Sequence, residues 1–189
     1  MAQTNSLPPR SEVPLSETWA LDSVFATPAD WEAACQRLDT LLPDLTAYRG
    51  RLGESPQVLL AAIEKLEEVE TLLGKIVVYA NNASSVDTFD QAATARAGQA
   101  RSIAARAGAA RSFFDPELMA VGFDKLKGWI QSTPALAFFA QYLDRLEKRS
   151  PHVCSGEVEQ VLAMAGDPFS GAFNIFNMLN NADLKFQPA

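Results

Sequence analysis

The chain is 189 residues long, carries a formal net charge of −7 at pH 7 and is 48% hydrophobic. This length is enough for one domain with one core, or for a piece of a larger protein. The acidic balance, without a clustered face of lysine and arginine, argues against binding to nucleic acid or to an anionic membrane surface, because both need cations that neutralise phosphate.

The chain carries no signal for export or for insertion into a membrane. No apolar run approaches the roughly 20 residues that cross a bilayer. The N-terminus, residues 1–14, is polar and rich in proline and has no apolar signal-peptide segment. We therefore expect a cytoplasmic protein, in which Cys35 and Cys154 are free thiols.

A signal for the start of a helix occurs five times along the chain. In each case a residue with a capping oxygen precedes a proline, whose fixed φ suits the first position of a helix. The five pairs are Thr27-Pro28, Ser55-Pro56, Asp115-Pro116, Thr133-Pro134 and Asp167-Pro168. Each pair predicts a helix that begins at its proline.

The first two helices are marked by apolar residues at helical spacing. Behind Thr27 this spacing continues to Tyr48, and Gly50 is the candidate stop. Behind Ser55 it predicts a longer helix that reaches about Val86. The first half of this longer helix carries four glutamates, mostly off the apolar stripe: Glu64, Glu67, Glu68 and Glu70. We interpret them as a solvated face, with a metal or partner site as the less favoured alternative.

A third helix is predicted behind a cap at Asp87 and Thr88. Alanine and glycine lie on several of its faces and allow close approach of other helices, so we expect it to be the central and most enclosed helix. Its four arginines advance five residues at a time and therefore spiral around it: Arg96, Arg101, Arg106 and Arg111. This spacing favours interhelical or solvent ion pairs over a phosphate-binding strip.

The remaining helices are short. One opens at Asp115, another covers residues 123–130, and the next begins at Thr133. Ser155 and Asp167 are expected to start the last two. The helix behind Thr133 is predicted to bury Leu136, Phe139, Leu143 and Leu146.

The architecture that follows is an all-α, multi-helix antiparallel bundle with long helices, because short connections favour antiparallel neighbours. A polar N-terminal arm precedes the bundle. Residues 182–186 alternate between apolar and polar and predict a strand-like C-terminal tail.

The residues show no catalytic constellation. His152 is the only histidine, so a His-Glu-x-x-His zinc site cannot be built within the chain. Neither a Gly-x-Ser-x-Gly elbow nor a glycine-rich phosphate loop occurs. A metal site from His152 and Cys154, with Cys35 and Glu157 brought in by folding, is disfavoured against a histidine that caps or packs.

The phenylalanines allow two interpretations. They could line a groove for apolar peptide side chains, but at helical spacing they are more typical of a core. They are Phe113, Phe114, Phe138, Phe139, Phe169, Phe173 and Phe176. We therefore predict no catalytic, cofactor-binding or metal-binding residue in this chain.

A series of short landmarks nevertheless runs in order along almost the whole chain. It consists of residues 10–14, 18–22, 24–25, 31–32, 79–80 before 87–88, and 115–118, then His152 with Glu159 and residues 162–163, and residues 181–186. Together they resemble the N-terminal helical region of oligoendopeptidase F, in the thimet-oligopeptidase-like family of zinc metallopeptidases.

The resemblance implies a domain organisation. Residues 1–26 would form an extended N-terminal arm, residues 27–180 a helical domain, and residues 181–189 the start of the link into a missing catalytic domain. In that family two histidines of a His-Glu-x-x-His helix and a downstream glutamate hold the zinc, all beyond the equivalent of Ala189. The resemblance thus implies zinc for the full-length parent and none for this chain.

The resemblance also implies a function. The N-terminal helices of the family wall one side of a deep channel that admits short peptides. We expect this chain to be the non-catalytic channel domain of a zinc-dependent oligoendopeptidase, which hydrolyses internal bonds of oligopeptides. Its partners would be the missing catalytic domain and the oligopeptide substrates. The alternative is a free-standing helical adaptor or scaffold that keeps the fold without peptidase activity.

Overall fold

The computed structural model describes residues 12–86, 90–152 and, near the C-terminus, residues 171–172, 175–176, 179 and 184. All regular structure within these ranges is helical, which confirms the predicted all-α class. The chain forms two compact units, Met1–Leu143 and Asp144–Ala189.

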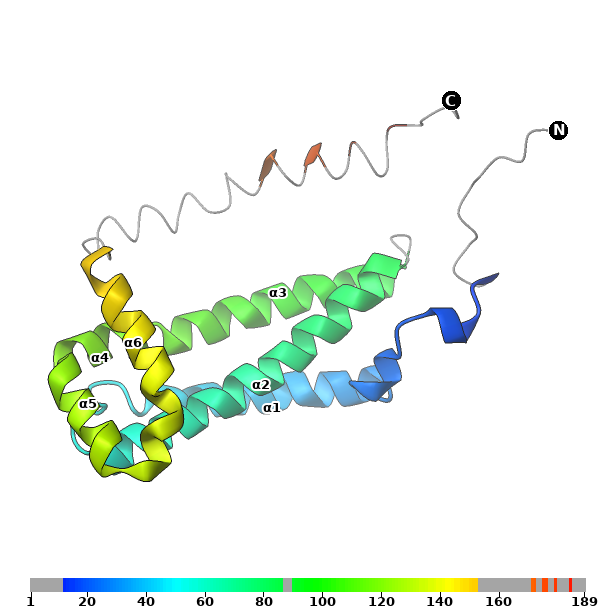
Figure 1. Ribbon diagram of the computed structural model, residues 1–189. Helices are drawn as coiled ribbons and strands as arrows, with labels where there is room; N and C mark the ends of the chain where they lie inside the picture. Colours follow the sequence, from blue (N-terminus) through cyan, green and yellow to red (C-terminus); the bar gives the residue numbers. More distant parts are fainter. Residues whose placement is uncertain are drawn as a thin grey trace. The chain divides into compact units, whose positions relative to one another are not determined.

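Three long helices make up most of the first unit: α1 (Pro28–Thr46), α2 (Pro56–Val86) and α3 (Gln91–Arg111). They pack against one another along their lengths (Figure 1). One cluster of buried side chains joins all three, with Trp31 and Leu38 from α1, Ile76 from α2 and Ile103 from α3 among its members. This shared cluster is the core of the unit.

The starts of α1 and α2 follow the predicted signals. The Thr27 hydroxyl accepts a hydrogen bond from the Asp30 amide at 3.2 Å, and the Asp30 carboxylate accepts one from the Thr27 amide at 2.9 Å. This reciprocal capping box satisfies two amides that the first turn leaves free. At α2 the Ser55 hydroxyl accepts from the Val58 amide at 3.2 Å. The predicted end of α2 at Val86 is also confirmed.

The start of α3 differs from the prediction. Its cap is Asp90, whose carboxylate accepts a hydrogen bond from the Ala93 amide at 3.0 Å. The predicted cap at Asp87 and Thr88 is therefore wrong, and both residues lie outside the described ranges. Several polar residues that can cap occur together before this helix, and spacing alone did not choose among them.

The prediction that α3 is the most enclosed helix is also wrong. Only one stripe of α3 is buried, formed by Ala93, Ala97, Ala100, Ile103, Ala107 and Ala110. Alanines on its other faces, such as Ala95 and Ala105, are exposed. Small side chains let α3 approach α1 and α2 closely, but the arginines between them require contact with solvent.

The remaining elements of the described residues are shorter helices. They are the 3-10 helices η2 (Leu15–Glu17) and η3 (Leu21–Ser23), then α4 (Phe114–Val121), α5 (Phe123–Ser132), η4 (Pro134–Phe139), α6 (Ala140–Arg149) and η5 (Ser150–His152). Helix α4 begins at Phe114, two residues before the predicted Pro116, and its N-cap is Phe113, so the predicted cap at Asp115 is wrong. The signal at Thr133 starts a 3-10 helix that continues into α6, and the apolar residues predicted for it are buried: Leu136, Phe139, Leu143 and Leu146.

The connection between α1 and α2 is held by two side chains from distant helices. Glu117 of α4 accepts hydrogen bonds from the backbone amides of Gly50, at 2.8 Å, and Leu52, at 2.7 Å. Lys125 of α5 donates to the Gly53 carbonyl at 2.9 Å. We call these contacts the clamp. Gly50, the predicted helix stop, lies within this connection at φ 80°, four residues after α1 ends.

The C-terminal predictions fall mostly on residues that are not described. The helix starts at Ser155 and Asp167 lie outside the described ranges, as does most of the strand-like tail. At Leu184 the backbone amide donates to the Leu179 carbonyl at 2.8 Å, which is a local turn contact rather than a strand pairing.

Candidate functional site

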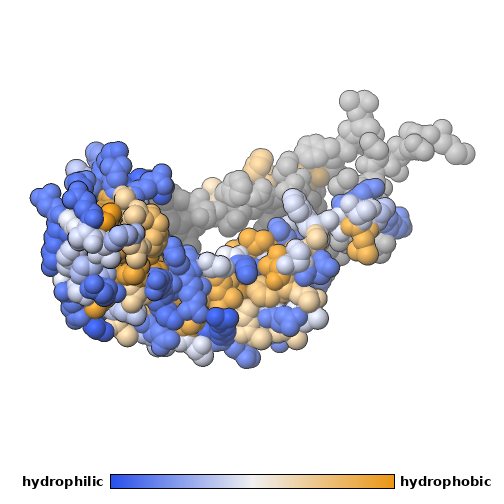
Figure 2. Space-filling view, turned by 60° about the horizontal axis from the view of Figure 1, so that its bottom comes forward, coloured by the Kyte–Doolittle hydropathy of each residue, from blue (hydrophilic) through white to orange (hydrophobic). Residues whose placement is uncertain are grey.

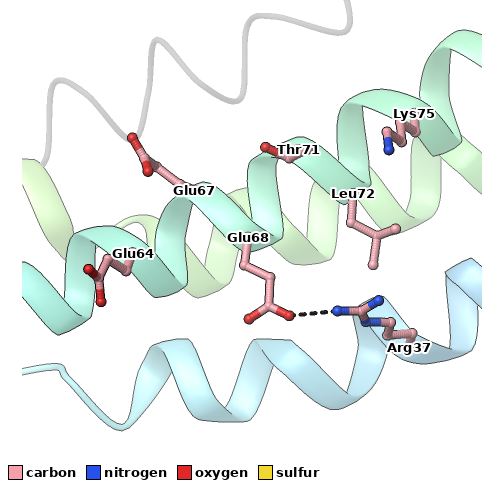
Figure 3. A pocket seen from close by; sticks show the side chains of 7 residues that line it. All are labelled: Arg37, Glu64, Glu67, Glu68, Thr71, Leu72 and Lys75. Atoms are coloured by element: carbon pink, nitrogen blue, oxygen red, sulfur yellow. Dashed lines mark hydrogen bonds and ion pairs between the residues drawn. The ribbon is translucent and has the colours of Figure 1, made fainter.

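A charged groove opens between α1 and α2 (Figure 3). Its volume is about 420 Å³. It is lined by Arg37, Glu64, Glu67, Glu68, Thr71, Leu72 and Lys75. Three of the glutamates that the sequence places on a solvated face thus line this groove, which we call the α1–α2 groove.

Glu68, one of the carboxylates that line the groove, has two cationic partners, Arg37 (Figure 3) and Lys65. It lies 2.7 Å from the Lys65 ammonium and 2.9 Å from the Arg37 guanidinium. These hydrogen bonds, the one from Lys65 first, lower the pKa of Glu68 below its ordinary value of 4.5. Glu68 is therefore a fixed anion at neutral pH, suited to holding α1 on α2 rather than to exchanging protons.

The interhelical ion pairs predicted for the arginines of α3 are present for two of them. Arg106 lies 2.8 Å from Asp39 of α1, and Arg111 lies 3.2 Å from a carboxylate oxygen of Glu70 of α2. All four side chains are partly exposed. These pairs tie α3 to both neighbours and do not form a site for phosphate.

The described residues do not fit a zinc ion. Within residues 12–86 and 90–152, no three or more histidine, cysteine, aspartate or glutamate side chains come close enough to hold a metal. His152 is exposed in η5, while Cys35 is buried in α1. Burial raises the pKa of the Cys35 thiol to about 11, with the charge of Asp39 as a further cause. The other candidate ligands, Cys154 and Glu157, lie outside the described ranges.

A second open pocket lies where α1 ends and α2 begins. Its volume is about 590 Å³. It is lined by Asp44, Ala47, Tyr48, Arg51, Gln57, Val58, Ala61 and Lys65. Arg51 is paired with Glu54 at 3.1 Å and Lys65 with Glu68, so the cations of this pocket already have anionic partners.

The core interpretation of the phenylalanines is confirmed for those that are buried, Phe113, Phe114 and Phe139. Phe138 and Phe176 are exposed, and Phe169 and Phe173 lie outside the described ranges. None of the phenylalanines within the described ranges lines the α1–α2 groove or the second pocket.

The apolar residues that do stand out were missed by sequence reasoning. Leu15 and Trp19, in the N-terminal arm, are 85% and 71% exposed. The available signal was a tryptophan in a segment whose apolar residues lack helical spacing, which periodicity does not detect.

Over the ranges that the structure describes, no helix is long and apolar enough to cross a bilayer.

Comparison with known proteins shows what this chain is similar to. Residues 117–186 match the model of the family described as Oligopeptidase F. Oligopeptidase PepF of Bacillus subtilis is 31% identical over 184 residues, which is 97% of this chain and 28% of PepF. The plasmid-encoded Oligoendopeptidase F of Lactococcus lactis subsp. cremoris is 27% identical over 93% of this chain and 30% of its own length.

Solved structures agree with these matches. The crystal structure of oligoendopeptidase-F from Enterococcus faecium superposes with a TM-score of 0.73 at 28% identity, over 84% of this chain and 30% of that one. A structure from Chlamydophila abortus, at 24% identity and a TM-score of 0.69, shares the fold. The chain spans about 30% of the length of the relatives it matches. These matches confirm the resemblance predicted from the landmarks.

Proposed function

We propose that this chain, a relative of oligoendopeptidase F over most of its length, forms the substrate-channel wall of a zinc-dependent oligoendopeptidase. The observation that carries the proposal is the match to Oligopeptidase PepF, which covers 97% of the chain but only 28% of PepF. The wall would be non-catalytic by itself. The larger remainder of a parent polypeptide would supply the catalytic domain, in a cytoplasmic enzyme.

The arrangement of the described residues supports a wall rather than a reaction centre. Three long helices share one core, and ion pairs join α3 to α1 and α2. The α1–α2 groove is lined by charged side chains, of which Glu68 is already neutralised by two cations. A rigid scaffold of this kind can orient and confine a flexible peptide while the chemistry takes place elsewhere.

Zinc would belong to the remainder of the parent. A zinc ion in such an enzyme supplies an activated water for attack on the scissile carbonyl. The described residues of this chain offer no set of ligands for it. The contribution of this chain would be to bind and orient the oligopeptide and to exclude folded proteins.

A chimera tests the proposal. In it, this chain replaces the matched 28% of Bacillus subtilis Oligopeptidase PepF. Hydrolysis of an internally quenched oligopeptide and of a folded protein is measured for the chimera, for PepF and for this chain alone. We expect the chimera to cleave the oligopeptide and not the folded protein, to lose activity with a chelator and to regain it with zinc. We expect no turnover from this chain alone.

Two results would contradict the proposal. Zinc-dependent hydrolysis by the metal-loaded isolated chain would show that the wall is itself an enzyme. A chimera that folds but cleaves no oligopeptide, beside an active PepF control, would remove the channel role and favour the helical adaptor.

A further inference from the structure

We infer that the N-terminal arm, at Leu15 and Trp19, is an anchor that docks this chain onto the remainder of its parent polypeptide. The inference rests on the proposed function, because the occupant of the docking surface is the part of the parent that this chain does not include. It adds where on the chain the contact is made.

The exposure of these two side chains is the first observation. At 85% and 71%, Leu15 and Trp19 are the most exposed large hydrophobic residues in the part of the chain that the structure describes. Tryptophan is highly buried on average in folded proteins. Tryptophan is also enriched among the residues that carry most of the binding energy at protein interfaces.

The second observation is that local hydrogen bonds hold the arm in shape. The Thr18 amide and hydroxyl both donate to the Leu15 carbonyl, at 3.2 and 2.8 Å. The Glu17 amide donates to the Pro14 carbonyl, and the Leu21 amide to the Trp19 carbonyl, each at 2.9 Å. The backbone that carries both apolar side chains is thus ordered before any partner binds, which lowers the entropy cost of docking.

The arm is also fixed to the core directly after Trp19. Leu21, Val24 and Phe25 pack against the central cluster. The Phe25 ring meets the Tyr79 ring edge-on, with centroids 5.6 Å apart. Trp19 is therefore presented two residues from a firmly packed segment rather than on a free tail.

Further apolar surface lies on the C-terminal half of α2, next to the arm. Val78 and Val86 are 49% and 38% exposed. The Phe25–Tyr79 contact and the bond from the Trp31 indole to the Ile76 carbonyl, at 3.0 Å, place this part of α2 beside the arm and the start of α1. Figure 2 shows hydrophobic surface on this part of the molecule, bordered by hydrophilic residues.

The occupant follows from the relatives. This chain spans only 28 to 31% of their lengths, so most of such a polypeptide lies outside it. The alignment with PepF covers 97% of the chain, too much to leave Leu15 and Trp19 outside the matched region. The acidic residues on this arm, Glu12, Glu17 and Asp22, are exposed. The complementary surface is therefore an apolar pocket with a basic rim.

Footprinting measures the contact directly. Hydroxyl-radical oxidation of Trp19 is followed by mass spectrometry in this chain alone and in the chimera with PepF. Because burial at the centre of an interface removes most of the exposure of an anchor residue, we expect the oxidation rate of Trp19 to fall about threefold or more in the chimera. Equal rates in a folded chimera would overturn the inference, as would a Trp19 already protected in the isolated chain.

A binding experiment in trans keeps the test valid if the chimera does not fold. This chain is titrated into the remaining part of PepF, and the double variant Leu15→Ser/Trp19→Ser is compared with Phe138→Ser. Phe138 is a matched control because it is a large hydrophobic residue that is 54% exposed and belongs to η4, not to the arm. Loss of two anchor residues corresponds to about tenfold or more in Kd, while Phe138→Ser should leave Kd unchanged. Equal Kd values for both variants would contradict the docking role.

The two proposals fail separately. Peptide hydrolysis by a chimera with a fully oxidisable Trp19 would leave the proposed function standing and overturn the docking surface. A protected Trp19 in a chimera that cleaves nothing would support the docking surface and contradict the channel role.

Discussion

Glu117, a half-buried residue of α4, joins segments that are far apart in the sequence. Its two carboxylate oxygens accept hydrogen bonds from the amides of Gly50 and Leu52, across 67 and 65 residues of sequence. Hydrogen bonds to a charged group are worth more than neutral ones, and an amide left without its acceptor keeps its desolvation cost. A single side chain thus fixes the connection between the two helices that form the α1–α2 groove.

We predict that Glu117→Gln lowers the free energy of unfolding by about 1–3 kcal/mol. A glutamine has one acceptor oxygen, so its NH₂ group must face one of the two backbone amides. Urea unfolding followed by circular dichroism measures the loss. Glu67→Gln, at an exposed position on α2, is the matched control and should change the stability by less than about 0.5 kcal/mol. Equal effects of the two substitutions would contradict the role of Glu117.

Cys35 gives a second prediction at the scale of one residue. Burial raises the pKa of its thiol from 9.0 to about 11. The folded state therefore holds the proton more tightly, so its stability is unaffected below pH 9 and falls as the pH rises from 9.0 towards 11. Only the thiolate reacts with disulfide reagents.

In a Cys154→Ser background, we expect Cys35 of the folded chain to react about 100-fold more slowly at pH 8 than Cys35 of the urea-unfolded chain, since two pKa units separate the two states. Release of thionitrobenzoate measures both rates. Reaction at similar rates in the two states would show that Cys35 is not buried as described.

At the scale of elements, the connection that the clamp holds also lies very close to the side chain of Val121. A β-carbon built on Gly53 would lie 2.9 Å from Cγ2 of Val121, the last residue of α4. Valine is branched at Cβ and cannot turn the methyl group away easily. The α1–α2 connection and α4 thus fit together only because residue 53 has no side chain.

We predict that Gly53→Ala lowers the stability by about 1–3 kcal/mol through overpacking. Gly74→Ala is the control, because a β-carbon there meets nothing within 4 Å in the interior of α2. It should raise the stability by about 0.5–1 kcal/mol. The loss of stability in the double variant Gly53→Ala/Val121→Ala should be smaller than the sum of the losses in the two single variants. Full additivity would show that the two residues do not meet.

The Glu68 pairs predict how the contact between α1 and α2 depends on pH. Lys65 and Arg37 lower the pKa of Glu68. A lowered folded pKa means that the stabilisation is present above 4.5, the ordinary value, and is lost as the pH falls through the folded pKa. The difference in stability between wild type and Glu68→Gln should therefore be largest near neutral pH and vanish in acid.

Urea midpoints taken from about pH 7 down to about pH 3 measure this difference. Added salt should reduce it at neutral pH, because the pairs are exposed to solvent. Glu67→Gln again serves as control and should show no such trend. A difference that grows as the pH falls would have the wrong sign for this mechanism.

Local signals predicted helices well where a capping residue was followed by apolar residues at helical spacing. The capping box at Thr27 and the apolar stripe from Pro56 to Val86 are examples, because both depend on neighbours within a few residues. The start of α3 at Asp90 was missed because several polar residues before it can cap. The clamp was not predictable, since a contact across 67 residues leaves no trace in local spacing.

At the scale of the whole molecule, Trp31 joins the main parts of the first unit. It is fully buried in the cluster that α1, α2 and α3 share, and its indole nitrogen donates to the Ile76 carbonyl at 3.0 Å. We predict that Trp31→Ala costs about 3–5 kcal/mol, a large part of the roughly 5–15 kcal/mol that stabilises a domain.

Unfolding followed by circular dichroism measures this cost, and we expect the unfolding transition of Trp31→Ala to lose its cooperativity. Trp129→Ala is the matched control. Trp129 is half-buried in α5, with the Lys125 ammonium 4.8 Å from its ring centroid, and its loss should cost clearly less. Equal costs for the two tryptophans would contradict the central place of Trp31.

The sequence indicated the function of the whole molecule through its landmarks, whereas it indicated the fold through local helix signals. No residue or motif of the sequence indicated a reaction. Among the described residues, no group of side chains that could hold a metal ion is formed either. The landmarks between residues 10 and 186 indicated the resemblance as a series rather than as a site. The exposure of Leu15 and Trp19 could not be predicted, because it depends on what packs against the arm.

The clamp also bears on how this protein can be modified in the laboratory. Surface connections between helices are the usual places to insert a tag, a second domain or a chain break. The α1–α2 connection looks suitable because it is largely exposed. Yet Gly50 needs a left-handed backbone, and Gly53 has no room for a side chain. Glu117 and Lys125 also hold the segment through hydrogen bonds to its backbone. Split-protein or biosensor designs should therefore avoid residues 47–55.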